Sequence, residues 1–169
     1  MATGRRSRPS PAHPRSSVNH PRLETIMTSP SSTSKIRSGG CHCGEVRYEL
    51  QGDVANATLC HCTLCRATTG APVVAWCSVE AMNFRFTQGF PRNYRSTPRG
   101  MRTFCAKCGT QLTFREDGET CIDVTTASLD DPNAEAVSPR DQTYARSQLS
   151  WMGSAHALPY FSTTRQHER

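Results

Sequence analysis

The chain has 169 residues, of which 36% are hydrophobic and 20% are charged, and its formal net charge is +6. This length allows one domain with some surplus, and no stretch is apolar over the roughly 18 residues that a membrane span needs. Residues 1–40 hold seven basic side chains and one acid, so they account for the whole net charge. The pI of about 9.0 therefore does not indicate a basic nucleic-acid-binding face on the rest of the chain.

Residues 1–35 are predicted to be a disordered basic tail. Five prolines lie among serine, threonine and arginine residues there, and few apolar side chains are available for burial. The composition is loosely like that of an organelle transit peptide, but the prolines oppose the amphipathic helix of such a peptide. A flexible tail, or a later start at Met27, is the favoured interpretation. Because no apolar secretory signal is present, we expect a cytoplasmic protein.

Residues 36–165 are predicted to form one mainly β domain of small antiparallel sheets. Alternating or continuous apolar residues predict short strands within the ranges 46–50, 72–79, 84–86, 102–114 and 120–126. No segment carries a long apolar stripe of helical period, and residues 128–134 offer at most one helical turn.

Nine cysteines are many for this length, and their clustering in an odd number favours metal binding over disulfides. In extended backbone, Cys41 and Cys43 point to the same face, and the histidine between them points away. Cys105 and Cys108 have the spacing of a zinc knuckle. Together the two pairs supply four thiolates, which is the donor set of a closed, structural zinc site. The alternative is that all four are buried free thiols.

Cys60, Cys62 and Cys65 form a second group without a nearby fourth ligand. Three protein ligands with one open position are typical of a catalytic zinc, and these three cysteines are the predicted catalytic residues. An ion held in this way can bind an incoming thiol as its reactive thiolate. Alternatively, the group is oxidised without metal, or a fourth side chain completes a second structural site. The candidates for that fourth side chain are Cys77, Cys121, His61 and His156.

Other residues have weaker predicted roles. Cys77 and Cys121 are interpreted as small buried residues within strands. Asp123 either orients a ligand or pairs with an arginine at the end of a strand. Trp151 is expected in the core or in a pocket wall, and His156 is a pocket base or an ordinary histidine.

The sequence resembles the glutathione-dependent formaldehyde-activating enzyme (Gfa) and centromere protein V family. The matching segments are residues 39–50, 60–72, 104–114, 122–132 and 158–161, with the cysteine motifs in the same order and spacing. The resemblance implies a β-tent organised around a structural zinc, and a second zinc that is catalytic. The implied ligands are Cys41, Cys43, Cys105 and Cys108 for the first ion, and Cys60, Cys62 and Cys65 for the second.

The resemblance also implies a carbon–sulfur lyase that joins glutathione and formaldehyde to give S-hydroxymethylglutathione. The expected partners are therefore a small thiol and a small aldehyde, with neither a membrane nor a nucleic acid. Backbone N–H groups of residues 68–70 are a candidate oxyanion site. Arg66, Arg99 and Arg102 are candidates for binding the carboxylates of the thiol.

Two other functions stay open. A non-catalytic zinc-binding interaction module is the main alternative, and the charged tail favours it slightly. A methionine sulfoxide reductase on a similar scaffold needs a redox cysteine apart from the metal, for which Cys121 is the candidate.

Overall fold

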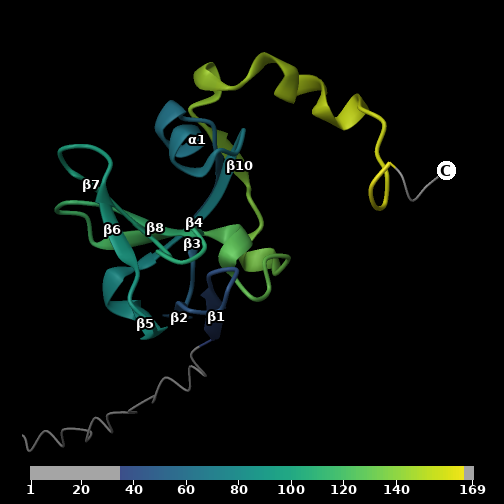
Figure 1. Cartoon of the computed structure of the whole chain (residues 1–169). Helices are drawn as coiled ribbons and strands as arrows, with labels where there is room; N and C mark the ends of the chain where they lie inside the picture. The colour runs from purple at the N-terminus through teal and green to yellow at the C-terminus, as the bar shows by residue number, and fades with distance from the viewer. Residues whose placement is uncertain (1–34, 166–169) are drawn as a thin grey trace, which may run out of the picture. The chain divides into compact units, whose positions relative to one another are not determined.

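The computed structural model describes residues 35–165, and its architecture is mainly β (Figure 1). The strands form two sheets, one of three strands and one of seven. The prediction of a mainly β fold with small antiparallel sheets is therefore confirmed. The predicted tail lies outside the described residues except for Lys35, so its disorder and the domain boundary stay predictions.

The small sheet is antiparallel and has the strand order β1-β2-β5. Its strands are β1 (Ile36–Gly40), β2 (Arg47–Gln51) and β5 (Phe84–Gln88). Val46, Tyr48 and Leu50 are at most 1% exposed, which confirms the alternation predicted for residues 46–50.

The large sheet has the strand order β10-β3-β4-β9-β8-β7-β6. In chain order its strands are β3 (Ala55–Cys60), β4 (Val74–Glu80), β6 (Arg92–Arg95), β7 (Gly100–Phe104), β8 (Gln111–Glu116), β9 (Cys121–Thr125) and β10 (Asp141–Thr143). All neighbours are antiparallel except β10 and β3, which are parallel. Every predicted strand has a counterpart, and β7 and β8 are joined by the predicted Cys-X-X-Cys turn.

The main core combines side chains from both sheets. Tyr48 and Leu50 of β2 belong to one buried cluster with Leu112 of β8 and Val124 of β9, and all four are 0% exposed. The hydroxyl groups of Tyr48 and Ser128 are hydrogen-bonded at 2.7 Å, which satisfies the one polar atom of that buried ring. The two sheets are thus held together by this apolar cluster, which also includes Cys41 and Cys105, the residues that directly follow β1 and β7.

The helix α1 (Thr63–Thr69) was not predicted from the sequence. It has a single buried residue, Cys65, so it carries no apolar stripe that could reveal it. Its N-cap is Cys62, whose sulfur accepts the Cys65 N–H, and it ends at Gly70, where φ is 71°. A thiol replaces the usual Ser, Thr, Asp or Asn cap here, so the ordinary start signal is missing from the sequence.

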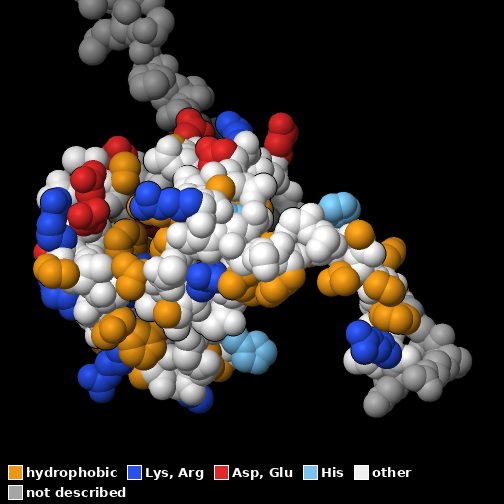
Figure 2. Space-filling model, turned by 90° about the horizontal axis from the view of Figure 1, so that it is seen from above, with side chains coloured by type: hydrophobic (Ala, Val, Ile, Leu, Met, Phe, Trp, Pro, Cys, Tyr) orange, Lys and Arg blue, Asp and Glu red, His pale blue; other side chains and the backbone are white. Residues whose placement is uncertain are grey.

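The remaining helical segments are 3-10 helices, of which four have three residues and η5 has eight. They are η1 (Ala81–Asn83), η2 (Thr126–Ser128), η3 (Glu135–Val137), η4 (Ala145–Ser147) and η5 (Ser150–Ala157). Trp151, Leu158 and Tyr160 are 52%, 61% and 91% exposed, and Figure 2 shows hydrophobic side chains along this C-terminal segment. Within residues 35–165, no helix is long and apolar enough to cross a bilayer.

Candidate metal centres and the adjoining cavity

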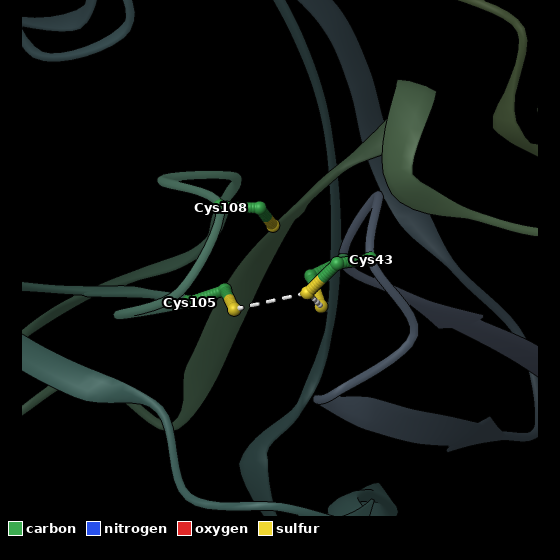
Figure 3. Close-up of side chains that lie close together, drawn as sticks. Cys43, Cys105 and Cys108 are labelled. Atoms are coloured by element: carbon green, nitrogen blue, oxygen red, sulfur yellow. Dashed lines mark hydrogen bonds between the residues drawn. The ribbon is translucent and has the colours of Figure 1, made fainter.

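The four-cysteine group, Cys41, Cys43, Cys105 and Cys108, lies where the β1–β2 and β7–β8 connections meet. All four sulfur atoms lie within 4.8 Å of one another. The Cys43 sulfur is 3.6 Å from that of Cys41 and 3.8 Å from that of Cys105 (Figure 3). Four sulfurs bound to one tetrahedral zinc at ~2.3 Å lie roughly 3.8 Å apart. The group therefore has the spacing that such an ion requires.

Hydrogen bonds favour the thiolate form of part of this group, while at Cys43 the hydrogen bond from the Glu45 backbone is outweighed by burial and the neighbouring thiols, which raise the pKa to about 11. The Val46 N–H donates to the Cys41 sulfur at 3.2 Å. A hydrogen bond with the Thr110 hydroxyl, together with backbone N–H groups, lowers the pKa of Cys108 to about 5. Gly109 has a φ of 77° and donates its N–H to the Cys105 carbonyl, which closes the turn in a left-handed conformation. The thiolate is the form that binds metal, so the turn is suited to a cation.

The three-cysteine group, Cys60, Cys62 and Cys65, is formed by the end of β3 and the first turn of α1. Its three sulfur atoms also lie within 4.8 Å of one another, and Cys60 and Cys65 are buried. Among residues 35–165, no further His, Cys, Asp or Glu side chain belongs to this group. An ion held there has three protein ligands from the described part of the chain.

The candidates for a fourth ligand do not join the three-cysteine group. The His61 Nε2 is hydrogen-bonded to Gln142 Oε1 at 2.8 Å, and the ring does not join the sulfurs. Cys77 is fully buried inside β4, as predicted. The Cys121 sulfur lies 3.5 Å from Glu80 Oε1, and His156 lies in the exposed C-terminal segment. Cys121 is half-buried and does not line the cavity described below, which gives no support to the reductase hypothesis.

The electrostatics of the three-cysteine group call for a neighbouring cation. Burial opposes ionisation of Cys62, but the Cys65 N–H donates to its sulfur at 3.2 Å, and with the two neighbouring thiols this lowers its pKa. Burial, reinforced by Cys62, raises the pKa of Cys65 to about 12. Several thiolates can therefore coexist here only beside positive charge, such as a divalent metal ion.

A cavity of about 330 Å³ opens over the three-cysteine group. All three of its cysteines line the cavity, while none of the four-cysteine group does. The other lining residues that bear on its chemistry are Trp76, Ser78, Arg102, Phe114 and Asp123. The volume is at the lower end of the range for small-molecule sites, so the cavity suits a small ligand.

Asp123 of β9 is the acid of this cavity. It lies opposite Ser78 of β4 in the sheet, and the Ser78 hydroxyl donates to its Oδ1 at 2.6 Å. Burial raises the pKa of the Asp123 carboxyl above its ordinary value. Its hydrogen-bond partner is Ser78, while Arg102 of the same cavity acts on it electrostatically and opposes this rise, so the expected arginine neighbour is present without forming an ion pair.

Arg102 is the only one of the three candidate arginines that lines the cavity. Arg99 forms an exposed ion pair with Glu116 at 3.5 Å, and Arg66 lies on α1. Arg102 is 4% exposed, and its Nη2 lies 3.6 Å from the Cys65 sulfur. The guanidinium carbon lies 4.6 Å from the Phe114 ring centroid and 5.9 Å from that of Trp76.

Two further expectations are wrong. Thr68 and Thr69 belong to the last turn of α1, and the Gly70 N–H donates to the Arg66 carbonyl at 2.8 Å. The backbone groups of residues 68–70 are therefore used by the helix and its end, and they form no oxyanion site. Trp151 is neither core nor pocket wall, because it is 52% exposed and does not line the cavity.

Sequence reasoning missed Trp76, Phe114 and Ser78 as cavity residues. Trp76 and Ser78 lie at alternate positions of β4, so the period of the strand places them on one face. That alternation was the available signal, but it could not indicate which of the two cysteine groups this face of the strand lies beside.

The model of the glutathione-dependent formaldehyde-activating enzyme family matches residues 36–147, which is more than half of the chain. The chain belongs to this family. A crystal structure of a Rhodobacter sphaeroides protein is 24% identical, with a TM-score of 0.50, and the match covers 63% of this chain and 99% of that one. That likeness supports the fold alone. Residues 158–161, which contributed to the predicted resemblance, lie outside the range matched by the Gfa model.

Membership of the Gfa family indicates a formaldehyde-activating function in general terms. The two cysteine groups could each hold a metal ion, and their all-sulfur donor sets are consistent with zinc.

Proposed function

We propose that the protein is a zinc-dependent carbon–sulfur lyase that adds a small thiol such as glutathione to a small aldehyde such as formaldehyde. The supporting observation is the asymmetry between the cysteine groups. Three sulfurs line a cavity of about 330 Å³, and the four-cysteine group lies apart from it. The family match supports the same reaction class.

In this proposal the four-cysteine group holds a structural zinc, because four sulfurs complete its coordination. Cys60, Cys62 and Cys65 would hold the catalytic zinc beside the cavity that would receive the thiol. A zinc ion bound there supplies a Lewis acid that keeps a bound thiol in its nucleophilic thiolate form. The protein then has to place the aldehyde, exclude water and move one proton.

The overall reaction forms one C–S bond and involves no change of redox state. The sulfur donates an electron pair to the carbonyl carbon, and the π electrons of the C=O bond move to the oxygen. The thiol proton has to reach that oxygen. The raised pKa of Asp123 suits its carboxyl to accept and return this proton, and the hydrogen bond from Ser78 fixes its orientation.

The rings of Trp76 and Phe114 contribute the apolar wall of the cavity. Formaldehyde reacts readily with water, so an apolar wall beside the sulfurs favours addition of the thiol over addition of water.

The test is an adduct assay on the zinc-loaded protein. ¹³C-formaldehyde and glutathione are mixed with native protein. NMR exchange spectroscopy then measures how much faster S-hydroxymethylglutathione forms than it does spontaneously. We expect Cys62→Ser to lose the enzyme-dependent rate and Cys121→Ser, a cysteine outside both groups, to retain it. Absence of any native enhancement, or full activity in Cys62→Ser, would overturn the proposal.

The non-catalytic interaction module stays the second candidate. The exposed Trp151, Leu158 and Tyr160 favour it, because neighbouring exposed apolar side chains often mark contacts with a partner. Metal analysis separates the two hypotheses. Two zinc ions per chain, one of them accessible to thiols, support the enzyme, whereas a single tightly held zinc supports the module.

A further inference from the structure

We propose that Arg102 is the internal counter-ion of the three-cysteine group, and that its charge allows this group to bind a fourth ligand as an anion. The inference deepens the proposed function, on which it rests for the identity of that ligand, a thiolate.

The guanidinium charge of Arg102 is buried. Its side chain is 4% exposed, and no carboxylate among residues 35–165 forms an ion pair with it. Its Nε donates to the Ser96 hydroxyl at 3.1 Å, and Nη1 is buried without a hydrogen-bond partner in the described part of the chain. A buried guanidinium is costly unless an anion compensates its charge.

A cysteine sulfur lies within reach of this guanidinium. The Cys65 sulfur, 3.6 Å from Nη2, is the ionisable group within hydrogen-bonding distance of the guanidinium in the described structure, and it becomes the matching anion once a bound cation keeps it as a thiolate. Asp123 lines the same cavity and feels the Arg102 charge at longer range, but its hydrogen-bond partner is the Ser78 hydroxyl. The cysteine sulfurs are therefore the natural partner of Arg102, and a neutral set of thiols would leave its charge uncompensated.

The position of the guanidinium is restrained by its neighbours. Arg102 lies opposite Phe114 in the β7–β8 pairing, and its charge is placed over that ring and towards Trp76. With Ser96 holding Nε, the side chain is restrained from several directions. Arg102 thus acts through the sulfur group, as a positioning residue, and needs no contact with the substrate.

Arg102 would also change the net charge of the three-cysteine group once it holds a divalent ion. A divalent ion with three thiolates has a net charge of −1, and a fourth thiolate changes it to −2. Arg102 shifts these sums to 0 and −1. In a buried site an added anion is strongly disfavoured when the net charge is already negative. Arg102 therefore favours a thiolate as the fourth ligand, while a neutral ligand gains much less from it.

The test compares an anionic and a neutral ligand at fixed pH. The full chain is loaded with Co²⁺, whose sulfur charge-transfer bands report the fourth ligand. It is then titrated with 2-mercaptoethanol, which binds as a thiolate, or with imidazole. We expect Arg102→Met to weaken thiol binding at least about tenfold and to change imidazole binding little. Arg102→Lys is expected to restore most of the thiol affinity because it keeps the charge.

Arg99→Met is the matched control, since Arg99 is exposed and pairs with Glu116. It is expected to bind both ligands as the native protein does. If Arg102→Met does not fold, Arg102→Gln removes the charge, keeps hydrogen-bond donors and provides the same comparison with Arg102→Lys. The probe thiol has no carboxylate, so an effect limited to glutathione would overturn the counter-ion role in favour of a carboxylate anchor.

The remaining outcomes are also distinct. Equal thiol binding by native protein and Arg102→Met, or equal losses for thiol and imidazole, overturns the inference alone. Thiol binding that depends on Arg102, without any formaldehyde adduct, overturns the proposed function and supports the inference. Failure of the native cobalt protein to bind either ligand overturns both.

Discussion

The two cysteine groups share their donor chemistry and their compactness, and they differ in their surroundings. In each, the sulfur atoms lie within 4.8 Å of one another. The four-cysteine group is formed by two turns whose N–H and hydroxyl groups surround the sulfurs. The three-cysteine group lies below a cavity with aromatic rings, a buried arginine and an acid. The residues around the sulfurs, more than the sulfur ligands themselves, therefore separate a centre suited to hold the fold from one suited to bind a reagent.

The largest expected effect is loss of folding in Cys105→Ser. Cys105 is 0% exposed and joins two connections that are distant in the sequence. Structural zinc sites contribute about 10 kcal/mol or more to folding, which matches the whole stability of an ordinary domain. Circular dichroism and zinc content measure the effect. Cys62→Ser is expected to remain folded, and similar unfolding of the two variants would contradict the division between the groups.

The next effect is stepwise metal loss. A mild chelator is expected to remove zinc from the three-cysteine group first, because that group has fewer ligands and opens to the cavity. The far-UV circular dichroism spectrum should change little at this stage and collapse only when the second ion leaves. Simultaneous loss of both ions together with the fold would show that the groups are not independent.

A smaller effect is expected from Asp123→Asn. Because burial raises the pKa of this carboxyl, protonation stabilises the native protein at low pH, and this contribution is lost as the pH rises through the native pKa. The variant should therefore exceed the native protein in stability at neutral pH, by a margin that shrinks as the pH falls through the native pKa towards the ordinary aspartate value of 3.8. Urea unfolding of both proteins across this range measures the margin.

Asp117 provides the control of opposite sign. The neighbouring Arg95 lowers the pKa of its carboxyl, so Asp117→Asn should not increase stability at neutral pH. A pH-independent margin for Asp123→Asn would contradict the raised pKa of Asp123.

The smallest effect is expected from Trp151→Ala. Trp151 is 52% exposed and lies beyond residues 36–147, the range matched by the family model. The free energy of unfolding should change by no more than about 0.5 kcal/mol, and the adduct rate should be unchanged. A large loss of activity would mean that the C-terminal segment belongs to the reactive centre.

Local patterns explain what could be predicted from the sequence. Cys41 and Cys43, like Cys105 and Cys108, are ligand pairs at short spacing, and the alternation around Tyr48 marks a strand by itself. The cavity could not be predicted in this way. Ser78, Arg102 and Asp123 come from three strands, and only the pairing of those strands places them together. Arg102 also has no local signal that separates it from Arg66 and Arg99.

Strand β7 connects the cavity to the four-cysteine group. It places Arg102 beside the cavity and, three residues later, Cys105 follows it into the four-cysteine group. Three residues of extended chain span about 10 Å, so ordering of one end constrains the other. Assembly of the four-cysteine group therefore also limits where the Arg102 charge can lie beside the cavity.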